Sequence, residues 1–296
     1  MIKFAFFGSS DFSIYVLDAL KKQSILPALI ITTPDKQKGR GLVLTPTPVK
    51  IWAQKNSIPV LDPIKLDDAF IDQCKGFPCT DLSVVASYGK IIPEQIINMP
   101  TYNTLNVHPS LLPKYRGASP IQNVMIDDTK NTGVTIIRLD KEMDHGPIVA
   151  TKNMHFDEWP VYEKIEEKLG TAGGDLLAEI MPDWIAGKIK AVDQDHSQAT
   201  FTKKITKIDG LLDPGDFRAD VPPERAYTAF RKIQAYHLWP GTYFFLEKKS
   251  SGSTADKKIR VKITSASWQN NRIIIEKVIP EGKREMLYKD FSGNIS

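Results

Sequence analysis

The stretch IKFAFFGSSDFSIYVLDALKKQ, residues 2–23, decides the fold class of this chain. Its first seven residues, Ile2–Gly8, are mostly apolar, which is typical of a strand that is buried on both faces. A helix is predicted from about Phe12 to Gln23, with its N-cap among the polar residues 9–11. A buried strand that leads directly into a helix is the repeating unit of α/β proteins.

The same alternation continues through the first half of the chain. Further strands are predicted at residues 29–32, 82–86, 104–107, 134–139 and 148–154. Further helices are predicted at residues 48–54, 67–75, 120–126 and 162–185, the first of them with Thr47 as N-cap and Pro48 as its first residue. Strands that alternate with helices favour a doubly wound parallel sheet, so residues 1–189 are expected to form a Rossmann-like α/β domain.

The character of the chain changes after Lys188. Residues 190–205 are polar with little periodicity and are predicted to form a linker. In residues 206–296, one helix at 223–234 is followed by β-rich runs at 242–247, 259–265 and 272–278, with an exposed hairpin loop at 248–258. This pattern favours a smaller C-terminal OB-like β-barrel domain.

Net charge also separates the two parts of the chain. Residues 201–296 contain 18 basic and 11 acidic side chains and so carry +7, whereas the first 200 residues carry −3. A basic C-terminal part beside a near-neutral N-terminal part indicates an anionic partner for the end of the chain.

Several classes of protein lack their usual sequence signals. No apolar run is long enough for a membrane helix and the start has no signal-peptide pattern, so a cytoplasmic protein without membrane association is expected. The turn after the first strand has one glycine, Gly8, where a nicotinamide oxidoreductase needs three at fixed spacing. The two cysteines, Cys74 and Cys79, are not completed by histidines into a zinc set, so reduced thiols and no metal are expected.

Polar side chains gather at the end of a predicted central strand. Strand alternation places Asn106 and His108 on one face, and Pro109 ends the strand directly after them. Doubly wound sheets bind ligands at this carboxyl edge, and Asp144, in the loop after the next strand, is expected at the same edge near His108. Structural hydrogen bonds or a turn explain these residues equally well, and His145 is a rival catalyst, so the pattern alone leaves the role open.

Longer motifs resemble the folate-dependent formyltransferase family. They are Asn106, His108, SLLPKYRGASPIQ (Ser110–Gln122), GVT (Gly133–Thr135) and DHGPI (Asp144–Ile148). Family members act on glycinamide ribonucleotide, on amino sugars or on methionyl-tRNA. The basic loop at 33–50, with QATFTKKI (198–205), LWPG (238–241) and EGK (281–283), resembles the members that act on methionyl-tRNA. Asn123 and His145 depart from the commoner pattern, in which a tryptophan and a small residue or threonine stand.

The resemblance implies a reaction and its residues. The α-amino group of charged initiator methionyl-tRNA attacks the formyl carbon of the co-substrate 10-formyltetrahydrofolate. Asn106 and His108 donate to the developing oxyanion, and Asp144 orients His108 or handles a proton. The pterin pocket is expected to be lined by Tyr88, Gly89, Ile91, Ile92, Ser110, Leu111, Leu112 and Pro113. Contacts with tRNA are expected from Lys36, Lys38, Arg40, Lys203 and Lys204, in a protein that acts as a monomer.

Two other functions fit parts of the same evidence. A formyltransferase acting on a sugar or a ribonucleotide would share the chemistry, but the basic loop and the basic C-terminal part argue against it. A non-catalytic RNA-binding protein on this fold would not require Asn106, His108 and Asp144 together.

Overall fold

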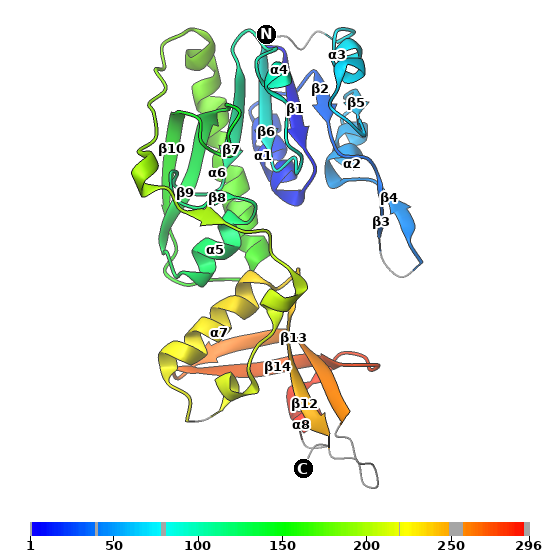
Figure 1. Cartoon of the computed structure of the whole chain (residues 1–296), viewed down its shortest axis with the longest axis vertical. Helices are drawn as coiled ribbons and strands as arrows, with labels where there is room; N and C mark the ends of the chain where they lie inside the picture. The colour runs from blue at the N-terminus through cyan, green and yellow to red at the C-terminus, as the bar shows by residue number, and fades with distance from the viewer. Residues whose placement is uncertain (1, 39–40, 78–80, 219, 249–256, 293–296) are drawn as a thin grey trace. The chain divides into compact units, whose positions relative to one another are not determined.

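The computed structural model of the chain describes residues 2–38, 41–77, 81–218, 220–248 and 257–292 (Figure 1). The chain forms two compact units. The first comprises Met1–Pro120, Asn131–Phe156 and Ile165–Lys203, and the second comprises Ile121–Lys130, Asp157–Lys164 and Lys204–Ser296. The domain boundaries at residues 189 and 205 stay a prediction.

The first unit is built on a seven-stranded sheet of order β10-β9-β7-β6-β1-β2-β5. The strands are β1 (Phe4–Gly8), β2 (Leu29–Ile31), β5 (Val60–Leu61), β6 (Leu82–Ala86), β7 (Thr104–His108), β9 (Asn131–Arg138) and β10 (Ile148–His155). The strands from β5 to β7 pair in parallel, whereas β9 runs antiparallel to both β7 and β10. The predicted α/β fold is therefore confirmed, with a mixed rather than wholly parallel sheet. A short loop joins β9 to β10, and only antiparallel neighbours can be joined in this way.

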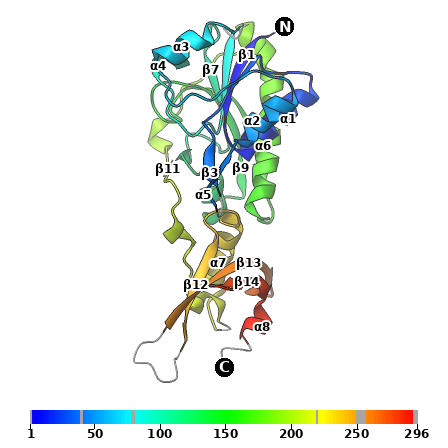
Figure 2. The same cartoon turned by 90° about the vertical axis from the view of Figure 1, so that its right-hand side faces the viewer.

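Helices cover both faces of this sheet. They are α1 (Asp11–Lys22), α2 (Pro48–Lys55), α3 (Asp68–Cys74), α4 (Glu94–Ile97) and α6 (Tyr162–Ile185). Helix α5 (Pro120–Ile126) belongs, apart from its first residue, to the second unit. On one face, Phe70 of α3 and Ile96 of α4 pack against apolar side chains of β1, β2 and β6. Figure 2 shows α1 and α6 on the opposite side from α3 and α4. As predicted, the Thr47 side chain caps α2 by accepting a hydrogen bond from the Lys50 amide at 3.1 Å.

Helix α6 approaches the sheet closely because glycines line its buried side. A methyl group at Gly173 would lie 2.5 Å from Cγ1 of Val107 in β7. One at Gly170 would lie 2.7 Å from Cβ of Tyr15 in α1. Interior glycines cost a helix roughly 0.5–1 kcal/mol each, so the close packing of α6 must offset that loss.

The basic loop at 33–50 contains a two-stranded hairpin. Strand β3 (Lys36–Lys38) pairs antiparallel with β4 (Val43–Thr45). Leu42, Val43 and Leu44 are each more than 60% exposed, so this hairpin presents apolar as well as basic side chains. Arg40 lies outside the described residues.

The stretch predicted as a linker is partly built into the first unit. Strand β11 (Phe201–Thr202) pairs in parallel with β8 (Arg116–Gly117), and the short 3-10 helix η1 (His196–Gln198) precedes it. Two further 3-10 helices, η2 (Lys207–Gly210) and η3 (Pro214–Phe217), follow in the second unit. Residues 190–203 are therefore not a structureless connection.

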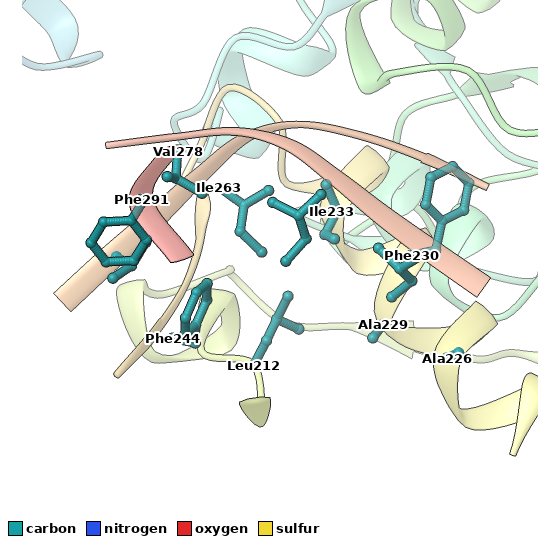
Figure 3. Close-up of a cluster of buried hydrophobic side chains, with 12 residues drawn as sticks. Leu212, Ala226, Ala229, Phe230, Ile233, Phe244, Ile263, Val278 and Phe291 are labelled. Carbon is teal, nitrogen blue, oxygen red and sulfur yellow. The ribbon is translucent and has the colours of Figure 1, made fainter. Parts of the chain in front are cut away.

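The C-terminal part of the second unit is an antiparallel sheet packed against a helix. Its strands are β12 (Thr242–Lys248), β13 (Lys257–Gln269), β14 (Arg272–Pro280) and β15 (Met286–Leu287), and its helices are α7 (Pro223–Ala235) and α8 (Tyr288–Ser292). Figure 3 shows the core, in which Phe230 and Ile233 of α7 meet Phe244, Ile263 and Val278 of the sheet. The predicted β domain is present as the strand order β12-β13-β14-β15, and the pairings of its described strands do not close a barrel.

Two expectations about metals and membranes can be compared with the described part of the chain. Cys74 is buried, and Cys79 lies outside the described residues. The residues with described positions contain no group of three or more histidine, cysteine or acidic side chains arranged to hold a metal ion. Among those same residues, no helix has the length and apolar character needed to traverse a bilayer.

Candidate active site

Strand β7 carries the first two candidate residues in the middle of the sheet. Asn106 and His108 are 8% and 4% exposed, and β6 and β9 flank the strand on either side. His108 Nε2 lies 3.0 Å from the carbonyl oxygen of Tyr115. Since a carbonyl only accepts, Nε2 is the donor, which leaves Nδ1 facing Asp144. Both side chains are held at fixed positions by the sheet and by these contacts.

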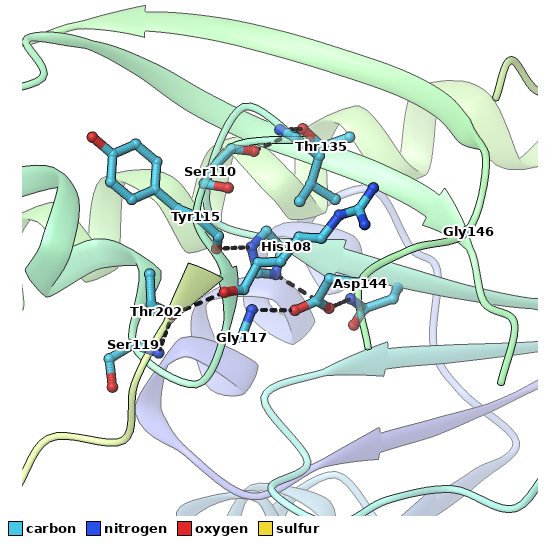
Figure 4. A network of polar contacts seen from close by, with 12 residues as sticks. His108, Ser110, Tyr115, Gly117, Ser119, Thr135, Asp144, Gly146 and Thr202 are labelled. Atoms are coloured by element: carbon cyan, nitrogen blue, oxygen red, sulfur yellow. Dashed lines mark hydrogen bonds and ion pairs between the residues drawn. The ribbon is translucent and has the colours of Figure 1, made fainter. Parts of the chain in front are cut away.

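Asp144 lies against both of these residues, and Figure 4 shows its carboxylate beside the His108 ring. Its Oδ1 accepts a hydrogen bond from Asn106 Nδ2 at 3.4 Å and lies 3.5 Å from His108 Nδ1. Its Oδ2 accepts from the backbone amide of Gly117 at 2.8 Å. The side chain is 13% exposed, so one nearly buried carboxylate joins a carboxamide, an imidazole and a backbone N–H.

Asp144 reaches this position by a different route from the predicted one. Because β9 is antiparallel to β7, its last residue, Arg138, pairs with Leu105, and His108 pairs with Thr135. The loop after β9 therefore starts beside the beginning of β7, at the end of the strand away from His108. It then turns back, and this brings Asp144 to His108. The expectation that both strands end at one edge was wrong, although the side chains lie together.

The segment after β7 supplies the backbone groups of the site. Thr135 Oγ1 donates to the Ser110 carbonyl at 2.7 Å and accepts from the Leu112 amide at 3.1 Å. Ser110 Oγ donates to the Lys114 carbonyl at 2.7 Å. These bonds fix the turn that aims the Tyr115 carbonyl at His108.

A second layer of polar residues, which the sequence did not reveal, lies behind Asp144. Arg116 and Gln194 are 4% and 5% exposed. Arg116 donates to Gln194 Oε1 through Nε at 3.2 Å and through Nη2 at 2.7 Å, and Nη2 also lies 2.8 Å from Nδ1 of His196. The His196 ring stacks on His145 at 4.0 Å, and His145 Nδ1 lies 2.7 Å from Asp140 Oδ2.

Comparison with known proteins identifies the family of this chain. Residues 2–181 match the sequence family described as formyl transferase. A methionyl-tRNA formyltransferase of Sulfurihydrogenibium sp. (strain YO3AOP1) is 38% identical over 244 residues, which cover 82% of this chain and 76% of that protein. The chain belongs to the methionyl-tRNA formyltransferase family.

Other relatives cover nearly all of this formyltransferase. A methionyl-tRNA formyltransferase of Halalkalibacterium halodurans is 34% identical over 303 residues, which cover 98% of this chain and 94% of that protein. The structure of methionyl-tRNA formyltransferase from Clostridium thermocellum covers 95% of this chain and 99% of its own, with a TM-score of 0.58 at 15% identity. An N-formyltransferase from Helicobacter canadensis, solved with folinic acid and dTDP-3-aminofucose, has a TM-score of 0.61 at 14% identity and covers 91% of this chain and 89% of its own. At these identities the two structures establish the shared fold.

The residues predicted to line a pterin pocket in this formyltransferase differ widely in exposure. Tyr88 is packed edge-to-face on Phe7 with ring centroids 5.4 Å apart, and burial raises the pKa of Tyr88 to about 12. Ser110 and Leu112 are also buried. In contrast, Ile91 is 85% exposed, while Ile92 packs beside Leu139 on the core. Among these residues, Gly89 and Ile91 are therefore exposed, whereas Ile92, Leu111 and Pro113 are only partly accessible.

The residues predicted to contact RNA are mostly on the surface of this formyltransferase. Lys36, Lys203 and Lys204 are exposed, and Lys38 lies on β3. Lys90 donates to the carbonyls of residues 63 and 64 at 2.8 and 2.9 Å. Burial, and secondly the charge of Lys36, lower the pKa of Lys90. The positive charge of Lys36 thus acts on Lys90.

Proposed function

We propose that this chain transfers the formyl group of 10-formyltetrahydrofolate to the α-amino group of methionyl-tRNA. Formyl transfer to methionyl-tRNA is the activity that the names of its relatives give. The observation that carries the proposal is the convergence of Asn106 and His108 on Asp144, whose Oδ1 lies 3.4 Å from Asn106 Nδ2 and 3.5 Å from His108 Nδ1. In a purely structural role, the buried imidazole and the buried carboxamide would each need only one hydrogen-bond partner. Such a role does not require that both side chains share one buried carboxylate.

The proposed chemistry uses donors that are already in place. The neutral amine adds to the formyl carbon, and the carbonyl oxygen becomes an oxyanion. The Asn106 amide stabilises that oxyanion. So does His108 in its imidazolium form, in which Nδ1 carries a proton in addition to the one that Nε2 donates to the Tyr115 carbonyl, and one such donor contributes about 10²–10³ in rate. When the bond between carbon and the folate N10 breaks, N10 leaves with a proton and the amine nitrogen loses one. Asp144 orients both donors and takes part in that proton transfer through water.

The folate and the RNA are proposed to use different surfaces. Ile91 is an exposed apolar side chain near the buried Tyr88, and we assign the 88–92 and 110–113 segments to the pterin ring. We assign Lys36, Lys38 and Arg40 with Lys203 and Lys204 to tRNA phosphates, and residues 206–296 to a basic tRNA-binding domain. One chain supplies every residue of this proposal, which supports a monomer as the working unit.

An acceptor comparison tests the proposed reaction. The purified chain is given 10-formyltetrahydrofolate with charged initiator methionyl-tRNA, uncharged tRNA, glycinamide ribonucleotide or an amino sugar nucleotide. Formyl transfer is expected to the charged tRNA alone. Transfer to a small-molecule acceptor in its place would contradict the proposal, and no transfer at all would favour a non-catalytic RNA-binding protein.

Two substitutions test the assigned residues in the same assay. Asp144→Asn and Asn106→Ala are each expected to lower kcat by about 10²-fold or more. Asp72→Asn is the matched control, because Asp72 is a surface carboxylate with 70% side-chain exposure. Asp144→Asn with the rate of its control would remove Asp144 from the mechanism.

A further inference from the structure

Gln194 uses its whole side-chain amide to hold the loop that carries Asp144. Its Nε2 donates to the carbonyl of Asp144 at 2.9 Å and to the carbonyl of Gly146 at 2.7 Å. Its Oε1 accepts both bonds from Arg116. A primary amide has two N–H donors and one carbonyl, and each of these groups is engaged here.

The loop held by Gln194 has an unfavourable backbone conformation at Asp144. Asp144 has φ of 51°, in the left-handed region that costs an ordinary residue about 1 kcal/mol or more. Its carbonyl is held on one side by Gln194, and its carboxylate is held on the other by the Gly117 amide. Contacts on both sides of Asp144 thus keep it in this conformation.

Arg116, the partner of the Gln194 amide oxygen, is itself held in place. Arg116 pairs through its backbone with β11 and through its guanidinium with His196. Gln194 cannot turn its amide over, because its oxygen would then face two carbonyl groups and its N–H groups would face a cation. The orientation of the amide is therefore fixed, and so are the two carbonyls that it binds.

We propose that Gln194 is a positioning residue for formyl transfer, which acts through the backbone of residues 144–146 to hold the Asp144 carboxylate against Asn106 and His108. The inference rests on the proposed function. Since a displacement of about 1 Å in a reacting group costs about 10²-fold in rate, loss of the two amide bonds should reduce turnover without removing any group that contacts a substrate.

The experiment compares Gln194→Glu and Gln194→Met with Gln198→Glu and Gln198→Met in the full chain. Glu at position 194 keeps the shape of the side chain and the contact with Arg116, but its carboxylate has no N–H to donate to either carbonyl. Met removes the donors without adding a charge. Gln198 is the matched control, because it is an exposed glutamine in the same segment. We expect kcat to fall about 10²-fold in both Gln194 variants, with the KM values for folate and charged tRNA within threefold of the parent.

A double variant separates positioning from general stability. If Gln194 acts through Asp144, then Gln194→Met should slow an Asp144→Asn enzyme by less than threefold, because residues that act as a unit are not additive. Multiplicative losses, an unchanged kcat, or failure of both Gln194 variants to fold would overturn the inference. A parent chain that formylates no charged tRNA would instead overturn the proposed function.

Discussion

Gly146→Ala should disable transfer by pushing the Asp144 loop away from β9. The added methyl carbon would lie 1.9 Å from the Arg138 carbonyl oxygen and 3.0 Å from its carbon. Real Cβ contacts essentially never fall below 3.0 Å, so the loop and β9 must separate by about 1.1 Å. Both partners are backbone atoms, so no side chain can move aside to make room.

The size of the effect follows from that displacement. Asp144 lies two residues before Gly146, and the same Gln194 amide binds both carbonyls. A shift of about 1 Å at a reacting group costs about 10²-fold in rate, which corresponds to about 2.7 kcal/mol in the activation free energy. We therefore expect the single-turnover rate constant for formyl transfer to methionyl-tRNA to fall about 100-fold.

The assay is single-turnover formyl transfer at saturating folate and charged tRNA, with melting temperatures recorded in parallel. Gly76→Ala is the control, since a methyl group there meets only the Gln73 carbonyl oxygen at an ordinary 3.4 Å. It should react at the rate of the parent. If Gly146→Ala were folded and transferred formyl groups within threefold of the parent, the rigid placement of Asp144 would not be required for the reaction.

Three further predictions concern stability. Thr47→Ala removes the N-cap of α2 and should lower the free energy of unfolding by about 1 kcal/mol in a urea titration. Phe244→Ala should cost the second unit about 3–5 kcal/mol, measured the same way, because Phe244 is only 1% exposed in its core. Although burial acts to raise it, hydrogen bonds from Trp159 and Lys130 lower the pKa of Asp128. The ionised Asp128 carboxylate therefore stabilises the folded state above about pH 4, and this contribution is lost as the pH falls through the lowered pKa of Asp128. The difference in urea midpoint between the parent and Asp128→Asn should accordingly shrink from pH 6 to pH 3.

Local sequence signals predicted the elements of the fold well where caps and periodicity mark them. The ends of α5 and α6 and the Thr47 cap of α2 agree with the structure. The direction of β9 could not be predicted, because a buried strand has the same composition in parallel and antiparallel sheets. It depends instead on how the chain crosses between β7 and β9, which no local pattern encodes.

The candidate site also contains residues that could be predicted from the sequence and residues that could not. Asn106 and His108 were predictable, since strand alternation and a following proline place them together. Gln194 was not, because a single glutamine in an aperiodic polar stretch has no feature that marks it as buried. Its burial arises from Arg116, which is 78 residues away along the chain.

The glycine at position 173 constrains the chemistry from behind the sheet. Val107 stands between Asn106 and His108 and points to the other face, where Cγ1 would lie 2.5 Å from any Cβ at Gly173. Even alanine at position 173 would push on the strand that presents both donors. Residues on the substrate-facing side of the sheet can therefore vary among homologues, or be changed to engineer the acceptor specificity. At the contact between Gly173 and Val107, in contrast, any added carbon would move Asn106 and His108 themselves.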